Sequence, residues 1–133
     1  MKALKTWRTG LRIILLKAFS RRKGYVVIEP VTAEGVGKDT LFRCAAIAAA
    51  RASDPISACL RCYCGDVAVP PDRFHETDGL GVSAQFSGQM IHLGNTDYLN
   101  GLKVETPNIS EEAVFVALEG RLLGYFRLLK LGK

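Results

Sequence analysis

The sequence GLGVSAQFSGQMIHLGN, residues 79–95, predicts a β-hairpin more clearly than any other part of the chain. Apolar and polar residues alternate from Val82 to Phe86, which is the period of a strand with one buried face. Ser87-Gly88 supplies a two-residue turn, and a second alternating run, 89–93, follows it. The segment therefore predicts two adjacent antiparallel strands.

The residues before this hairpin predict one strand and then two helices. A β-branched and aromatic run ends at Pro30, where we expect the strand to stop. Asp39 is expected to cap the first helix, and Pro55 suits the first turn of the second. The expected ranges are 25–30 for the strand and 39–51 and 55–65 for the helices.

The residues after the hairpin predict a short helix and a second hairpin. Asn95 is placed to cap a helix through Leu99. Two apolar runs, 113–118 and 121–129, flank a turn at Glu119-Gly120. The order of elements predicts an α+β fold, with a mostly antiparallel sheet of about six strands and a helix pair packed on it.

Charge divides the chain into two parts. Residues 1–24 contain eight Lys or Arg and no Asp or Glu, so of the totals of 18 and 13 the remainder holds 10 basic and 13 acidic residues. We therefore predict a basic amphipathic arm, 1–23, and a module, 24–133. An excess confined to one arm argues against nucleic acid as a partner. No apolar run reaches the roughly 20 residues of a membrane span.

Two readings of the basic arm stay open. Its apolar residues fall at helical spacing, although the run 13–16 also suits a short buried strand. As a helix, the arm would either lie on an anionic membrane or acidic partner, or pack on the sheet with its charges in solvent. The residues expected to make the contact are Trp7, Arg8, Arg12, Arg21 and Arg22.

Three cysteines, Cys59, Cys62 and Cys64, crowd into six residues. Such spacing is a poor disulfide framework and favours a reduced, cytoplasmic setting. Three thiolates suit a soft metal ion such as copper or zinc, with His75 or His92 as a further ligand. The alternative is that they are small buried side chains on a packed helix, with His92 at the surface of its strand.

The Gly79-x-Gly81 motif also has two readings. Glycines let a ligand approach the backbone closely, or they form the turn that enters a strand.

The order of these features along the chain resembles that in the nucleotide-binding domain of copper-class P-type ATPases. The features are the helix pair, the Gly-x-Gly motif, the hairpin and Gly94-Asn95. The resemblance runs from about Lys23 to Leu129. It implies the fold of that domain and a site for ATP or ADP. The nucleotide-binding residues it implies are Gly79, Gly81, Val82, Gly94, Asn95 and Asp54.

The sequence departs from that family at positions that carry its chemistry. Asp54 stands where the resemblance places a base-contacting histidine, and Ala49 where it places a glutamate. The segment 15–22, which corresponds to the family's phosphorylation motif, contains no aspartate. The resemblance therefore implies a degenerate, non-catalytic copy that binds nucleotide weakly. From its length we also expect the protein to lack phosphorylation, actuator and transmembrane domains.

We therefore expect a cytoplasmic accessory protein, peripheral at the inner face of a membrane, that acts on a metal-transporting P-type ATPase or another membrane protein. The alternative is a soft-metal-binding accessory protein that uses the three cysteines.

Overall fold

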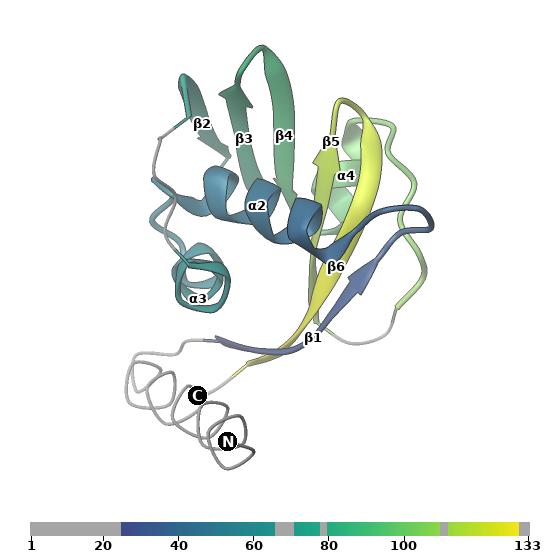
Figure 1. Cartoon of the computed structure of the whole chain (residues 1–133). Helices are drawn as coiled ribbons and strands as arrows, with labels where there is room; N and C mark the ends of the chain where they lie inside the picture. Colours follow the sequence, from purple (N-terminus) through teal and green to yellow (C-terminus); the bar gives the residue numbers. More distant parts are fainter. Residues whose placement is uncertain (1–24, 66–70, 78–79, 110–111, 131–133) are drawn as a thin grey trace.

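The computed structural model describes residues 25–65, 71–77, 80–109 and 112–130, which form one antiparallel sheet with helices on both faces (Figure 1). Six described strands lie in the order β1-β6-β5-β4-β3-β2. They are β1 (Tyr25–Thr32), β2 (Arg73–Thr77), β3 (Gly81–Phe86), β4 (Gln89–Gly94), β5 (Ala113–Leu118) and β6 (Arg121–Lys130). The helices are α2 (Lys38–Ala49), α3 (Pro55–Cys64) and α4 (Thr96–Gly101). The predicted α+β class is confirmed.

Both predicted hairpins are present, and their turns explain them. Ser87 and Gly88 join β3 to β4 with φ of 53° and 79°, and Glu119 and Gly120 join β5 to β6 with 51° and 81°. Positive φ at both turn residues matches the right-handed twist of the flanking strands. The register places Val82 opposite Leu93, so both apolar side chains enter the same layer.

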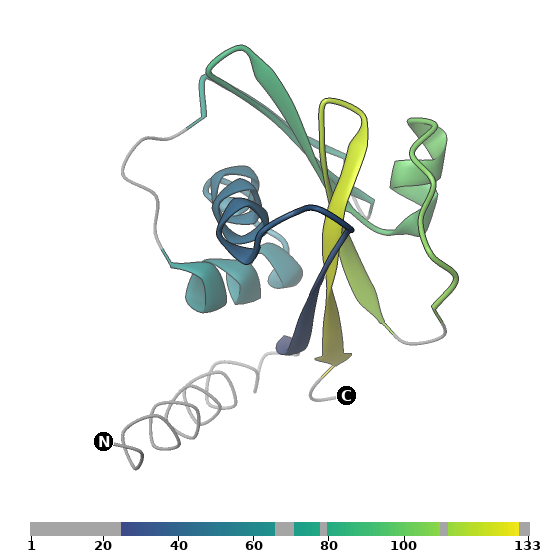
Figure 2. The same ribbon diagram turned by 45° about the vertical axis from the view of Figure 1, so that its right-hand side comes forward.

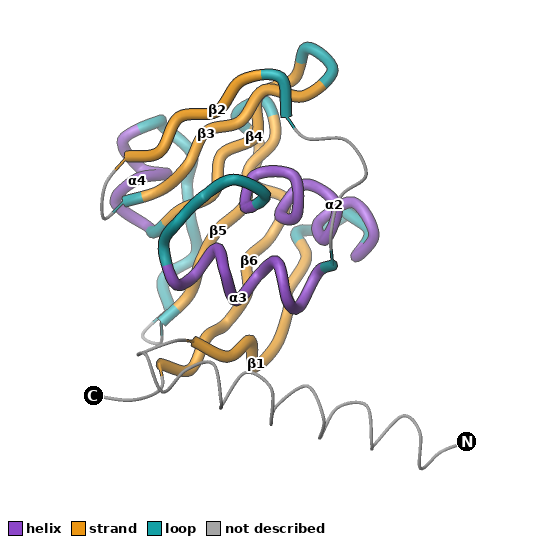
Figure 3. The backbone as a smooth tube through the Cα atoms, turned by 90° about the vertical axis from the view of Figure 1, so that its left-hand side faces the viewer, coloured by secondary structure: helices purple, strands orange, loops and turns teal. Residues whose placement is uncertain are grey.

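The sheet separates two layers of apolar packing. The helices α2 and α3 cover one face, where α2 crosses the central strands and α3 lies beside β1 (Figures 2 and 3). This face holds the larger core, which includes the fully buried Phe126 and Leu60. The short helix α4 covers part of the opposite face through Leu99, which packs with Phe115.

The small residues of α2 explain how tightly it packs on the sheet. From Cys44 to Ala49 every side chain is buried, and small side chains let a helix lie close to its neighbours. The predicted cap of α2 is wrong by two positions, since Gly37 is the cap residue and Asp39 lies in the first turn. An acidic residue there still interacts favourably with the helix dipole.

At the edges of the sheet, one predicted boundary is wrong and one strand was not predicted. The strand β1 continues through Pro30 to Thr32, because an edge strand pairs on one side only and tolerates a missing N–H. The strand β2 at the opposite edge was not expected. Of its five residues only Phe74 packs against the main core, so β2 carries no clear apolar alternation.

Candidate functional site

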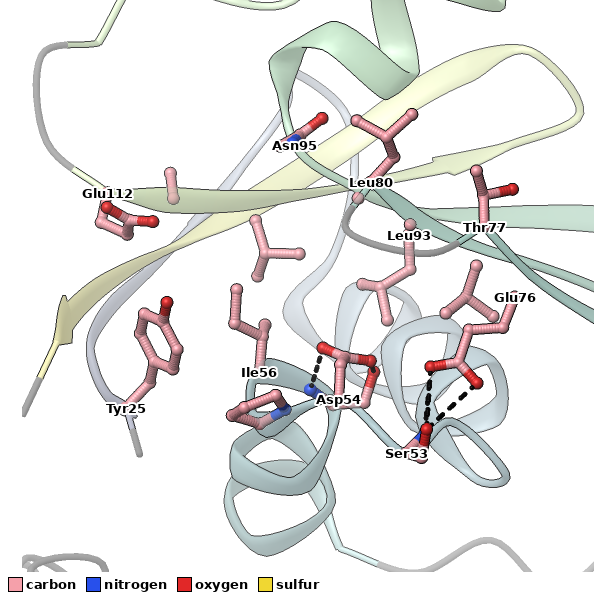
Figure 4. A pocket seen from close by; sticks show the side chains of 17 residues that line it. Tyr25, Ser53, Asp54, Ile56, Glu76, Thr77, Leu80, Leu93, Asn95 and Glu112 are labelled. Carbon is pink, nitrogen blue, oxygen red and sulfur yellow. Dashed lines mark hydrogen bonds between the residues drawn. The ribbon is translucent and has the colours of Figure 1, made fainter. Parts of the chain in front are cut away.

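A cavity of about 450 Å³ opens beside the start of α3 (Figure 4). Its other walls come from the first residues of β1 and β5, the end of β2, and the adjacent ends of β3 and β4. Tyr25 and Glu112 lie at one end in the view of Figure 4, and Ser53 and Glu76 lie at the other. This volume is within the usual range for small-molecule pockets.

Most residues expected to bind nucleotide meet at this cavity. Asp54, Gly81, Val82, Gly94 and Asn95 all line it, although they come from three separate parts of the chain. Pairing explains part of this arrangement, because Gly81 lies opposite Gly94 in the register of β3 and β4. Gly79, the remaining residue of the predicted set, lies outside the described residues.

Asp54 is held in place as the N-cap of α3. Its Oδ2 accepts a hydrogen bond of 3.0 Å from the Ser57 backbone N–H, and its Oδ1 accepts one of 2.7 Å from the Ser57 hydroxyl. The carboxylate therefore has a structural role at the wall of the cavity. Ala49, the other departure from the family pattern, is fully buried in the main core and does not line the cavity.

Two further polar contacts set the position of the α2–α3 corner. The Ser53 backbone N–H and hydroxyl each donate a hydrogen bond of 3.2 Å to Glu76 Oε2, which links the corner to β2. Arg61 Nη1 donates to the carbonyl oxygens of Ala49 and Ala52, both at 2.7 Å. Arg61 thereby satisfies carbonyls at the end of α2, as basic side chains commonly do. These bonds fix the angle between the helices and so shape the cavity.

Among the lining residues that sequence reasoning missed are three with ionisable side chains, Tyr25, Glu76 and Glu112. Burial raises the pKa of the Tyr25 hydroxyl, and the nearby carboxylates of Glu112 and Asp54 raise it further. No local motif marks these residues. Tyr25 and the start of β5 are brought together by the pairing of β1 with β6 and of β6 with β5, whereas Glu76 is brought to the cavity by the pairing of β2 with β3.

The three clustered cysteines do not converge on one point. Cys59 is 2% exposed within the core, whereas Cys62 is exposed and Cys64 is partly exposed. Burial, and secondarily Cys62, raise the pKa of the Cys59 thiol to about 12, which disfavours the thiolate that binds metal. Among the residues that the structure describes, no group of three Cys, His, Asp or Glu side chains is arranged to hold a metal ion.

His92 lies on the face of its strand opposite Ile91 and Leu93, as predicted, but it is partly buried rather than at the surface. Its face of the sheet is partly covered by α4, and the His92 and Tyr98 rings lie 6.0 Å apart between centroids. His92 Nδ1 is buried and has no hydrogen-bond partner among the described residues. Burial lowers the pKa of this imidazole, and Glu119 opposes the shift.

The predicted contact residues of the arm, Trp7, Arg8, Arg12, Arg21 and Arg22, lie outside the described residues. Within the described part of the chain, none of the helices has the length and apolar character needed to span a bilayer.

Comparison with protein-family models and with curated proteins gives no match to this sequence. Solved structures do match, and one is the N-domain of HMA6, a copper-transporting P-type ATPase. It has a TM-score of 0.66 at 16% identity, and the match covers 79% of this chain and 98% of that one.

Two larger structures match over a part of their length. The catalytic domain of the CPx-ATPase CopB-B gives a TM-score of 0.61 at 17% identity, covering 83% of this chain and 39% of that chain. A zinc-transporting PIB-type ATPase gives 0.63 at 19% identity, covering 83% and 20%. The chain thus has the fold of the N-domain of copper- and zinc-transporting P-type ATPases.

Proposed function

We propose that the cavity beside α3 binds the base of an adenine nucleotide and that ATP and ADP bind there weakly. The observation that carries this proposal is that five residues selected from sequence motifs line one cavity of about 450 Å³. The proposal that a chain of this fold binds nucleotide is also supported by the CopB-B neighbour, whose catalytic domain changes conformation upon nucleotide binding.

Leu80 offers a direct test of the site. Its side chain is 41% exposed and lines the cavity, so Leu80→Gln removes an apolar wall with little effect on the core. Leu102 has the same exposed fraction, 41%, and does not line the cavity, so Leu102→Gln is a matched control. Titration calorimetry with ADP should show binding in the millimolar range, which corresponds to about 4 kcal/mol. Leu80→Gln should weaken it and Leu102→Gln should not. Equal affinity in both variants would place the ligand elsewhere.

We also propose that this chain binds nucleotide without transferring phosphate. The first aspartate in the sequence is Asp39, which lies in the first turn of α2 rather than in a segment before β1. Phosphoryl transfer in P-type ATPases needs a carboxylate nucleophile. Incubation with ATP labelled at the γ-phosphate should leave the chain unlabelled, and acid-stable incorporation would overturn the proposal.

The proposed role is that of an accessory protein for a metal-transporting ATPase or another membrane system. The support is the fold, together with a segment that carries eight basic and no acidic residues before β1. Residues Arg8 and Arg12 are proposed to contact an anionic membrane or partner surface. Pelleting with phosphatidylserine vesicles should be weaker for the Arg8→Gln, Arg12→Gln double variant than for Arg121→Gln, which changes an exposed residue of β6. Equal pelleting would remove the membrane role.

A further inference from the structure

The candidate cavity is unusually acidic for a site that is expected to accept a phosphorylated ligand. Asp54, Glu76 and Glu112 line it, and they come from three separate segments of the chain: the cap of α3, the strand β2 and the residue before β5. None of its described lining residues is Lys, Arg or His. The carboxylates therefore face the ligand without a described cation beside them.

The hydrogen bonds of these carboxylates leave their charge in place. Both oxygens of Asp54 accept from Ser57, and Glu76 accepts from Ser53, and the donors are hydroxyl and backbone N–H groups that carry no charge. The side chain of Glu112 makes no hydrogen bond to another described residue, and the residue is exposed at the rim.

The remaining walls suit a flat, uncharged ring. Ile56, Leu80, Leu93 and Val114 contribute apolar surface, and the acidic side chains offer acceptors for exocyclic N–H groups. An anionic phosphate in the same space meets like charge. Repulsion between two unit charges about 4 Å apart weakens binding by roughly five-fold even in water.

We propose that the cavity selects its ligand by charge and takes adenosine, without phosphate, in preference to ADP or ATP. This inference rests on the proposed function, since it concerns the same cavity. The affinity is expected to fall in the order adenosine, AMP, ADP, ATP. Because the cavity is open to solvent, salt should screen the repulsion, and the differences among the four affinities should become smaller.

The test is a titration of the full chain with each of the four ligands, without divalent cations, at about 20 mM and at about 500 mM salt. At the higher salt concentration the Debye length falls well below the length of a triphosphate. We expect adenosine to bind at least about five-fold more tightly than ATP at low salt, the effect of one close like-charge pair. Equal or tighter binding of ATP would overturn the charge selection while leaving the nucleotide site intact. Failure of all four ligands to bind would overturn the proposed function itself.

Single-charge variants locate the source of the selectivity. Glu112→Gln removes one carboxylate of the cavity and keeps the size of an exposed side chain. At low salt, this variant should reduce the ratio of the adenosine affinity to the ATP affinity roughly five-fold, which is the effect of removing one close charge pair. Glu105→Gln makes the same change in net charge at an exposed residue that does not line the cavity, and the ratio should not change. If both variants narrow the ratio equally, net charge rather than the cavity sets it, and the inference fails.

Discussion

Gly81 lies opposite Gly94 in the register of β3 and β4, and the two residues together leave room for the ring of Tyr98. A Cβ atom on Gly81 would lie 2.6 Å from Tyr98 Cδ2, and one on Gly94 would lie 2.5 Å from the same atom. Tyr98 belongs to α4, which covers the face of the sheet opposite α2 and α3. The motif glycines therefore let α4 pack closely, while their backbones also form part of the cavity wall.

Substitution of Gly81 should destabilise the fold for this reason. In Gly81→Ala the new methyl would also lie 2.5 Å from the Leu93 carbonyl oxygen, so the backbone of the hairpin must shift. Overpacking of this kind costs about 1–3 kcal/mol, which urea denaturation measures. Gly101→Ala is the control, because a Cβ there meets nothing within 4 Å. Equal stability of the two variants would show that α4 does not rest on the glycine pair.

Asp54 combines a structural role with a place in the cavity wall, and two substitutions separate them. Asp54→Ala removes the acceptor of the Ser57 N–H and should lower the free energy of unfolding by about 0.5–2 kcal/mol. Asp54→Asn keeps an acceptor and should stay close to the parent stability, because Asn caps helices as well as Asp. A loss of equal size in both variants, measured by urea denaturation, would mean that the charge rather than the cap stabilises α3.

The elements that sequence analysis predicted well are those with strong local signals. Both hairpins were predicted from turn residues that adopt positive φ in the structure. Asn95 was predicted as a helix cap, and it caps α4 by accepting a 2.8 Å hydrogen bond from the Tyr98 N–H. The cavity was only partly predictable, because Glu76 and Glu112 reach it through strand pairing that no motif records. The strand β2 was missed for a related reason, since an edge strand with a single inward apolar side chain lacks the alternation that identifies a strand.

The different burial of the neighbouring cysteines predicts different reactivity. The exposed Cys62 should react with iodoacetamide in the native chain, whereas Cys59, at 2% exposure and with a pKa of about 12, should react only after unfolding. Peptide mass spectrometry with and without denaturant measures this. Addition of Zn²⁺ under reducing conditions should leave the labelling of Cys62 unchanged. Protection of Cys62 by the metal would instead restore the soft-metal alternative.

His92 should make the stability of the fold depend on pH. Burial lowers the pKa of the folded imidazole below its unfolded value, although Glu119 partly opposes the shift. The unfolded chain therefore binds the proton more readily, and the folded state is fully favoured only above the unfolded pKa of about 6.5. Stability should fall as the pH drops below that value, until the folded imidazole also becomes protonated.

Urea denaturation at pH 7.5 and pH 5.0 measures this dependence, and substitution assigns it. His92→Gln should reduce the loss of stability between the two pH values, because the protonation of a half-buried ring beside Tyr98 no longer contributes. His75→Gln, at the exposed His75 of β2, should show the same loss as the parent chain. An unchanged pH dependence in His92→Gln would show that other groups control the acid sensitivity, since carboxylates also titrate toward pH 5.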